Sequence, residues 1–252
     1  MSSRWVDEAY QGIVRTGFRL KRRLFKGKSP FQSVEVVETR GHGKLLLIDG
    51  MTMVSERDEF VYHEMIAHPA LFLHPRPRRV LVIGGGDGGT VREVLRHKSV
   101  ETCVLVEIDE LVIAASRRFL PKVAGALSDA RARVLIQDGV KFVAETKERF
   151  DVVIVDSTEP FGPAKELFGP AFYRNVARVL TTNGVVVSQA GSPFYEIGTI
   201  QGTAGQGGVF GDRHGPGRGV SVDGEGPGDE DGSAAFPIGT EQLAASGDQG
   251  RP

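Results

Sequence analysis

The sequence is poor in the features that mark secreted, membrane-bound or disulfide-stabilised proteins. Its 252 residues include a single cysteine, Cys103, so no disulfide framework can form. The first ten residues contain no apolar segment of the kind that a secretory signal needs. No apolar run reaches the roughly 18 residues that a membrane helix requires. These absences predict a soluble protein of the reducing cytoplasm, without a membrane partner.

Charge of one sign is also lacking, because 31 lysines and arginines face 32 acids and leave a formal net charge of -1. The basic residues are dispersed apart from the short cluster Arg19–Arg23, which we interpret as a solvated strand or turn and not as a nucleic-acid patch. The histidines, the cysteine and the acids show no metal-ligand spacing. We therefore expect neither a nucleic-acid partner nor a bound metal.

Residues 1–75 have the pattern of a small β-rich region followed by a connecting helix. Three valine- and leucine-rich segments bounded by turn residues predict strands, at Phe31–Glu38, Lys44–Ile48 and Thr52–Val54. Apolar residues at three- and four-residue spacing then predict a helix over Glu56–Leu73, which we expect Pro69 to kink or end. Pro75 and Pro77 mark a linker to the next domain.

Residues 76–200 alternate short apolar strands with helices. The predicted strands are Val80–Ile83, Cys103–Val106, Val134–Ile136, Val152–Val155 and Val185–Ser188. The predicted helices are Thr90–Arg96, Glu110–Phe119, Val140–Thr146 and Ala171–Leu180. Continuous apolar strands are typical of a parallel sheet covered on both faces, and right-handed crossovers make such a sheet doubly wound. We predict an α/β fold with a Rossmann-like catalytic domain that binds its ligands at the carboxyl ends of the strands.

Residues 201–252 differ in kind from the rest. About fifteen of the 33 glycines fall there, without a periodic apolar pattern. Such a segment buries too little apolar surface to offset its chain entropy, so we expect a disordered tail. The predicted five-stranded sheet also breaks off in the middle of its pattern, which indicates an incomplete catalytic domain.

The segment that follows the first parallel strand carries the clearest chemical signal. Its predicted nucleoside loop comprises Gly84, Gly85, Gly86 and Gly88, where glycines allow a tight turn and a close approach to a ligand. The next strand ends at Glu107, in position to accept hydrogen bonds from ribose hydroxyls. Asp87 lies within the loop, where its charge is unsuited to a pyrophosphate and suited to a cation. The loop therefore indicates a nucleoside ligand that carries positive charge.

Further acids follow the other predicted strands, so several carboxylates gather on one rim of the sheet. Asp138 and Asp156 follow the third and fourth strands, and Glu159 comes three residues later. One acid in such a place commonly caps a helix. Several carboxylates in one cleft repel each other, and a fold tolerates this when the ligand is cationic. A sulfonium nucleoside with a second cationic substrate fits this rim better than NAD does.

Several longer motifs follow one another along the chain: Glu56–Phe60, Tyr62–Met65, Gly84–Gly88, Val106–Asp109, Asp138–Gly139, Asp156–Pro163 and Phe172–Tyr173. With these motifs the chain resembles the spermidine synthase, or polyamine aminopropyltransferase, family over residues 5–200. The resemblance implies a fold of the S-adenosylmethionine-dependent transferase type. It implies transfer of the aminopropyl group of decarboxylated S-adenosylmethionine to putrescine, which gives spermidine and methylthioadenosine. It also implies a homodimer or homotetramer, with no permanently bound cofactor and no metal.

The resemblance implies a role for each matching residue. Asp156 is the expected catalytic proton acceptor, in a mobile loop from Ser157 to about Gly169. Glu107 is expected to bind the ribose and Asp138 the adenine. The other expected substrate-binding residues are Gln32, Gly139 and Pro163 around the nucleoside, Asp87 at the aminopropyl amine, and Tyr62, His63 and Glu159 around the diamine. Glu159 stands where many family members have aspartate.

Elementary chemistry supports this mechanism. A diamine is doubly protonated at neutral pH, since alkyl ammonium groups titrate near about 10, and a protonated amine cannot attack. Asp156 is placed to remove a proton as a general base, and binding both reactants in line contributes much of the acceleration. Asp87 would repel the carboxylate of intact S-adenosylmethionine and so favour the decarboxylated donor.

Three alternatives stay open. The first is a methyltransferase of the same fold that uses intact S-adenosylmethionine, against which Asp87 and the pair Asp156 and Glu159 argue. In the second, cadaverine, agmatine or spermidine replaces putrescine, because the parts of the pocket that read acceptor length are not evident from the sequence. The third is a truncated, frameshifted and inactive relative that binds a nucleoside without turnover.

Overall fold

A computed structural model of the chain describes residues 5–10, 12–158 and 166–189. The predicted site residues Glu159 and Pro163, part of the predicted loop 157–169 and the predicted tail 201–252 lie outside these ranges. The predicted domain limits at residues 75 and 200 remain predictions.

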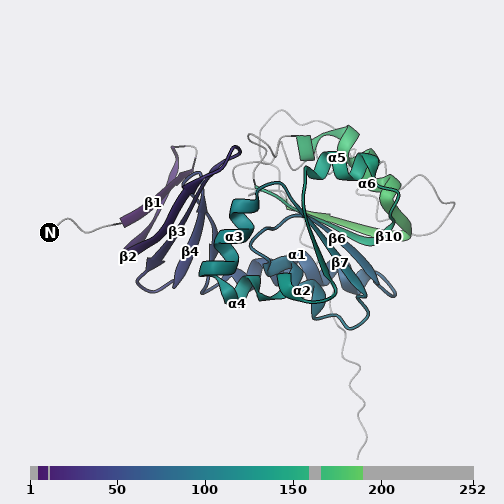
Figure 1. Cartoon of the computed structure of the whole chain (residues 1–252), viewed down its shortest axis with the longest axis horizontal. Coiled ribbons are helices and arrows are strands. Elements are labelled where there is room, and N and C mark those ends of the chain that lie inside the picture. The colour runs from purple at the N-terminus through teal and green to yellow at the C-terminus, as the bar shows by residue number, and fades with distance from the viewer. Residues whose placement is uncertain (1–4, 11, 159–165, 190–252) are drawn as a thin grey trace, which may run out of the picture. The chain divides into compact units, whose positions relative to one another are not determined.

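The chain begins with an antiparallel sheet of five strands in sequential order, β1-β2-β3-β4-β5 (Figure 1). The strands are β1 Trp5–Tyr10, β2 Val14–Lys28, β3 Ser33–Thr39, β4 Lys44–Ile48 and β5 Met51–Ser55. The last three confirm the predicted strands. The sequence pattern did not predict β1 and β2, because charged residues interrupt the apolar alternation there.

Strand β2 is stabilised by ion pairs with its neighbour β3. Arg22 Nε donates to Glu38 Oε2 at 2.6 Å, and Arg23 Nε donates to Glu35 Oε1 at 2.6 Å. The cluster Arg19–Arg23 therefore lies on a solvated strand, and its charges are partly matched within the sheet.

Helix α1, Glu59–Leu73, connects the two sheets. It begins three residues later than predicted, because the Glu56 carboxylate accepts a hydrogen bond from the Lys44 backbone N–H at 2.9 Å and stays with the sheet. Pro69 lies inside the helix and does not end it. Packing of the buried side chains of Ile66, Ala67 and Leu71 stabilises the helix and offsets the backbone hydrogen bond that proline cannot donate.

A parallel sheet of five strands follows, in the order β10-β9-β6-β7-β8. Its strands are β6 Arg79–Gly84, β7 Thr102–Glu107, β8 Ala132–Ile136, β9 Phe150–Asp156 and β10 Leu180–Ser188. All five predicted strands are confirmed, and the fold is the predicted Rossmann-like α/β arrangement with an N-terminal β-rich part. The strand order reverses at β6, so ligands are expected at the carboxyl ends of β6 and β9.

Among the described residues, five short helices accompany this sheet (Figure 1). They are α2 Gly89–Leu95, α3 Glu110–Phe119, α4 Pro121–Ala124, α5 Gly139–Glu145 and α6 Pro170–Val179. Helix α4 and a 3₁₀ turn over Gly125–Ser128 were not predicted, because each is too short to show a helical period.

Alternate residues of each strand pack on opposite faces of the parallel sheet. Val80 and Val82 of β6 face a core with α1 and α2, whereas Leu81 and Ile83 face a core with α5 and α6. A third core joins β3 and β4 to α3 and α4, through residues that include Val36, Leu46, Val112 and Leu120. The cavity described below is lined from both sheets.

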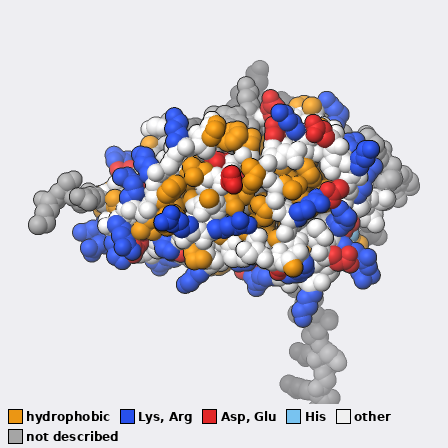
Figure 2. Space-filling model, viewed as in Figure 1, with side chains coloured by type: hydrophobic (Ala, Val, Ile, Leu, Met, Phe, Trp, Pro, Cys, Tyr) orange, Lys and Arg blue, Asp and Glu red, His pale blue; other side chains and the backbone are white. Residues whose placement is uncertain are grey.

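The surface carries basic and acidic side chains interspersed, with hydrophobic side chains gathered near the middle of the face in Figure 2. This agrees with the dispersed charge of the sequence. Within the described part of the chain, none of the helices combines the length and the apolar character needed to cross a membrane.

Candidate active site

A cavity of about 340 Å³ lies at the carboxyl ends of β6, β7 and β9. Its walls contain eleven of the predicted site residues: Gln32, Tyr62, His63, Gly84, Gly85, Gly86, Asp87, Glu107, Asp138, Gly139 and Asp156. Gly88, also predicted for the nucleoside loop, does not line the cavity. It precedes α2 at φ +89°, where a Cβ would meet Leu127.

The glycine loop lies directly against the end of β9. Gly84 has φ +80°, and a Cβ there would lie 2.1 Å from the backbone oxygen of Asp156. A Cβ on Gly85 would lie 2.7 Å from Asp156 Oδ2. Only glycine lets the two strand ends approach so closely, which brings Asp156 next to the loop.

Glu107 is buried at the end of β7 and accepts two backbone hydrogen bonds. Its Oε1 accepts from the Asp109 N–H at 2.9 Å, and its Oε2 accepts from the Gly86 N–H at 3.2 Å. Burial is the main reason that the pKa of Glu107 is raised to about 7, and the charges of Asp109 and Asp87 raise it further. A ribose that donates to this carboxylate would stabilise its charged form.

Asp109 connects this carboxylate to the N-terminal sheet, a link that the sequence analysis missed. Its Oδ2 accepts from Gln32 Nε2 at 3.0 Å and from Ser29 Oγ at 2.7 Å. Its Oδ1 accepts from the Leu111 N–H at 2.9 Å and so caps α3. The available signal was an acid two residues beyond Glu107, at the start of a predicted helix.

Asp138 is half-buried and caps helix α5, as an acid in this place commonly does. Its Oδ1 accepts from the Val140 N–H at 2.8 Å and from the Lys141 N–H at 3.3 Å. A Cβ on Gly139 would lie 2.4 Å from Ile83 Cγ2, so glycine lets α5 start against β6. Capping fixes the orientation of Asp138 at the cavity wall.

Asp156 is buried at the end of β9 and accepts a hydrogen bond on each carboxylate oxygen. Tyr62 Oη donates to Oδ1 at 2.6 Å, and Thr90 Oγ1 donates to Oδ2 at 2.6 Å. Burial and the nearby charge of Asp87 raise the pKa of Asp156, against the opposing effects of His63 and the two hydroxyl donors. The sequence analysis did not identify Thr90, which no motif distinguishes from an ordinary first-turn residue.

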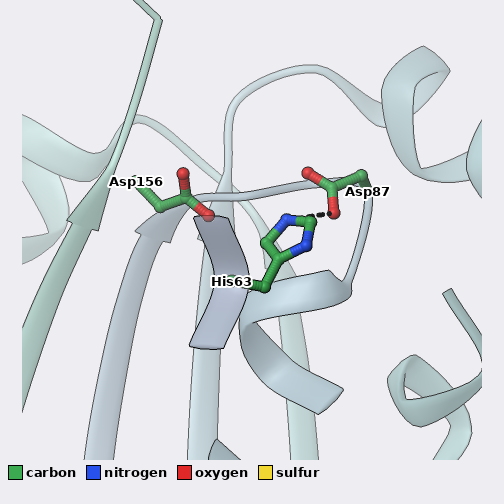
Figure 3. A group of neighbouring side chains, drawn as sticks. All are labelled: His63, Asp87 and Asp156. Atoms are coloured by element: carbon green, nitrogen blue, oxygen red, sulfur yellow. Dashed lines mark ion pairs between the residues drawn. The ribbon is translucent and has the colours of Figure 1, made fainter. Parts of the chain in front are cut away.

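The side chain of His63 lies between the carboxylates of Asp87 and Asp156 (Figure 3). Its Nε2 is 3.2 Å from Asp87 Oδ1, and its Nδ1 is 2.5 Å from Glu59 Oε2. Burial alone would lower the pKa of His63. The charges and hydrogen bonds of Asp87 and Glu59, with the charge of Asp156, outweigh burial and raise that pKa to about 10.

Glu59 and Asp87 are held as anions by their partners. Burial would raise both pKa values, but His63 and Arg92 lower the pKa of Glu59 to about 2. The His63 charge similarly holds the pKa of Asp87 below its ordinary value. Asp87 also accepts from the Gly89 N–H at 2.8 Å, so it is both charged and fixed in direction.

Two groups of side chains in the described part of the chain have the spacing of metal ligands, which the linear sequence did not indicate. The first is His63 with Asp87 and Asp156, inside the cavity. The second is Glu64 with His68 and Glu93, on α1 and α2.

In this second group the charges are already matched by the protein. Arg96 Nη1 lies 2.6 Å from Glu93 Oε2 and 3.2 Å from Glu64 Oε1, between the two carboxylates. His68 is half-buried, and its Nδ1 lies 2.9 Å from Nε2 of His97.

Comparison with known proteins identifies the family. A profile of the spermine/spermidine synthase domain matches residues 59–210, and a profile of the spermidine synthase tetramerisation domain matches residues 4–56. The chain belongs to the spermine/spermidine synthase family. The resemblance recognised in the sequence is thereby confirmed.

Similar proteins include polyamine aminopropyltransferases from archaea and bacteria. That of Methanocaldococcus jannaschii is 48% identical over 197 residues, which are 78% of this chain and 67% of the relative. That of Thermococcus onnurineus is 50% identical over 190 residues, 75% of this chain and 66% of the relative. The chain thus spans about two thirds of the length of these relatives.

Solved structures of spermidine synthases have the same fold. One, in complex with the transition-state analogue AdoDATO, has a TM-score of 0.81 and 40% identity, with 83% of this chain and 72% of that chain covered. The spermidine synthase from Thermotoga maritima has a TM-score of 0.79 at the same identity and coverage.

Proposed function

We propose that the chain transfers the aminopropyl group of decarboxylated S-adenosylmethionine to putrescine. The observation that carries the proposal is the buried carboxylate of Asp156, which lies at one cavity wall together with Asp87 and Glu107. Such a wall suits a nucleoside beside two cationic groups. A structurally similar spermidine synthase was solved in complex with the transition-state analogue AdoDATO, which supports the same class of ligand for this chain.

In the proposed reaction Glu107 accepts hydrogen bonds from the ribose and Asp138 binds the adenine. Asp87 binds the ammonium group of the aminopropyl arm. Asp156 takes a proton from the acceptor amine, whose nitrogen then attacks the propyl carbon bonded to sulfur. The new C–N bond forms as the C–S bond breaks, and methylthioadenosine leaves as a neutral product.

The hydrogen bonds to Asp156 favour this role. Tyr62 and Thr90 fix the carboxylate in direction, while burial raises its pKa toward the range useful for a general base. Glu159 as a partner of the diamine and Pro163 as part of the nucleoside site lie outside the described residues and stay predictions. Gln32 reaches the site through Asp109.

Three further points belong to the proposal. The match of residues 4–56 to a tetramerisation domain supports a homotetramer over a homodimer. Putrescine is proposed over cadaverine, agmatine or spermidine, and decarboxylated donor over intact S-adenosylmethionine because of Asp87. A cytoplasmic location and activity without a metal stay predictions.

The test is turnover by the purified chain, with spermidine and methylthioadenosine quantified by chromatography. Asp156→Asn keeps the shape of the side chain and removes the base, so turnover should fall by about 10²–10⁴. Binding of methylthioadenosine should stay within about twofold of the parent, since the proposed nucleoside ligands Glu107 and Asp138 are unchanged. Spermidine formation at the parent rate by the variant would refute the role of Asp156.

The parent chain should be assayed with each acceptor and each donor as controls. A preference for intact S-adenosylmethionine would favour the methyltransferase alternative. No product with any acceptor, from a protein that binds methylthioadenosine, would contradict the proposed transfer and favour the inactive relative.

A further inference from the structure

His63 is a buried side chain with an acid at each ring nitrogen. Its Nδ1 faces Glu59 at 2.5 Å and its Nε2 faces Asp87 at 3.2 Å, and the side chain is 2% exposed. A neutral imidazole has one N–H and would turn a lone pair toward one of these carboxylates. The two contacts together therefore stabilise the doubly protonated ring.

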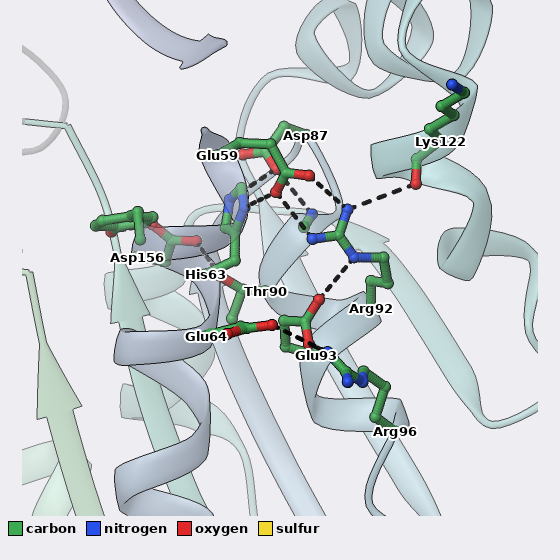
Figure 4. A network of polar contacts seen from close by, with 12 residues as sticks. Glu59, His63, Glu64, Asp87, Thr90, Arg92, Glu93, Arg96, Lys122 and Asp156 are labelled. Atoms are coloured by element: carbon green, nitrogen blue, oxygen red, sulfur yellow. Dashed lines mark hydrogen bonds and ion pairs between the residues drawn. The ribbon is translucent and has the colours of Figure 1, made fainter. Parts of the chain in front are cut away.

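Glu59 cannot turn away from His63, because Arg92 holds both of its carboxylate oxygens (Figure 4). Arg92 Nη1 and Nη2 donate to Glu59 Oε1 and Oε2 at 2.8 Å each. Arg92 Nε also donates to Glu93 at 2.8 Å, which anchors the guanidinium to α2. A bidentate pair of this kind fixes geometry as well as charge.

The charged and titratable groups around His63 come from four elements. Glu59 and Tyr62 lie on α1, Asp87 on the loop after β6, Arg92 on α2 behind Glu59, and Asp156 at the end of β9. Arg92 balances Glu59 and His63 balances Asp87. The protein therefore supplies a cation of its own beside Asp87.

A substrate ammonium group bound at Asp87 would lie against this imidazolium. Two positive charges in direct contact repel strongly in a partly buried site. The conflict ends when Nε2 loses its proton, because the neutral nitrogen then accepts a hydrogen bond from the ammonium group. The Nδ1–H, held by Glu59, stays in place throughout.

Resting on the proposed function, we propose that Glu59, anchored by Arg92, is a positioning residue that holds the Nδ1–H of His63. We propose further that Nε2 releases its proton to solvent when a substrate ammonium group takes its place beside Asp87. One proton is then released for each ammonium group bound there. The affinity of the site for the ammonium group should rise about tenfold per pH unit over the pH range in which His63 is protonated in the free protein and neutral in the complex.

The positioning role is tested without any ligand. The imidazole of His63 is followed by NMR between pH 5 and 10 in histidine-labelled protein, with His63→Gln to assign its signals. We expect the parent to stay protonated beyond about pH 8.5, well above the ordinary histidine midpoint. Glu59→Gln should lower the midpoint by about one unit or more, because it removes the anion at Nδ1. Arg92→Met leaves that anion in place and removes a cation behind it, so it should not lower the midpoint.

Arg96→Met is the matched control, because Arg96 also binds Glu93 from α2 but contacts Glu64 and not Glu59. It should leave the His63 midpoint unchanged. A parent midpoint near the ordinary value, or an unchanged midpoint in Glu59→Gln, would overturn the positioning role. If Arg92→Met fails to fold, the near-isosteric Glu59→Gln decides.

The proton exchange is tested by titration calorimetry of putrescine into protein saturated with methylthioadenosine, and separately of decarboxylated S-adenosylmethionine into the free protein. Buffers of low and high ionisation enthalpy at pH 7.5 and 8.5 report the protons released. We expect about one proton to be released per bound molecule of the ligand whose ammonium group reaches Asp87. Binding of both ligands without proton release would overturn the exchange. Failure of both to bind would contradict the proposed function and the exchange, while the imidazole titration would still decide the role of Glu59.

Discussion

Replacing Glu107 by glutamine should make the stability of the protein less dependent on pH. In the folded protein Glu107 is 7% exposed, and burial with the charges of Asp109 and Asp87 raises its pKa from 4.5 to about 7. The folded state therefore holds this proton more tightly than the unfolded state. The stability contributed by the protonated group is complete below about pH 4.5 and is lost as the pH rises through about 7.

The magnitude follows from the size of the shift. A shift from 4.5 to about 7 corresponds to about 3 kcal/mol, of which roughly 2.5 kcal/mol falls between pH 5 and 8. Glutamine does not titrate, so the variant escapes this loss. It also has one acceptor oxygen for two backbone donors, Gly86 and Asp109, which costs about 1–3 kcal/mol. That second effect is present at both pH values and largely cancels in the comparison.

The assay is urea unfolding of parent and variant at pH 5 and at pH 8. We expect the free energy of unfolding of Glu107→Gln, relative to the parent, to rise by about 2–3 kcal/mol between the two pH values. Glu110→Gln, exposed at the start of α3, is the control and should show no such change. If the free energies of unfolding of Glu107→Gln and the parent differ by the same amount at both pH values, the argument from burial is refuted.

Two further substitutions test the contacts around the proposed base and its neighbour. Thr90→Val removes the hydroxyl that donates to Asp156 and holds its pKa down, so the pKa of Asp156 should rise. The acidic limb of the kcat/KM profile should move to higher pH with it, whereas Thr90→Ser should leave the limb in place; an unchanged limb in the valine variant would contradict this. Gly89→Ala would place a Cβ 2.2 Å from His63 Cε1 and should raise the KM for putrescine by about tenfold or more, since overpacking displaces the ring. Gly125→Ala, whose Cβ meets nothing within 4 Å, should behave as the parent, and equal KM values for the two variants would refute the packing argument.

The parallel sheet could be predicted because its strands are continuous apolar runs bounded by turns. Strand β9 begins two residues before the predicted start and ends one residue after the predicted end, and its middle is completely buried. Strand β2 could not be predicted in the same way. Its basic residues are solvated, and their partners Glu35 and Glu38 belong to another strand, so no local period marks the element.

The candidate site was predictable to the extent that its acids follow strand ends. The carboxyl ends of parallel strands meet at one rim, so Asp87, Glu107, Asp138 and Asp156 could be grouped without coordinates. Their side-chain partners were not predictable, because the hydroxyl groups of Tyr62 and Thr90 and the imidazole of His63 reach them from helices distant in the sequence. Thr90, for example, is an ordinary helix residue in the sequence and a buried donor in the fold.

The count of acids on the rim also overstated the negative charge that a ligand meets. In the fold, the protonated ring of His63 lies against Asp87 and balances its charge, an effect that formal charges in a sequence do not reveal. A ligand cation therefore competes with a proton for Asp87. An ammonium group can donate an N–H to Asp87 in place of the imidazole, whereas a sulfonium centre has no such donor. Under the proposed function, the pairing of His63 and Asp87 should thus favour ligands with a primary amine at this point of the cavity over ligands that carry only a fixed positive charge.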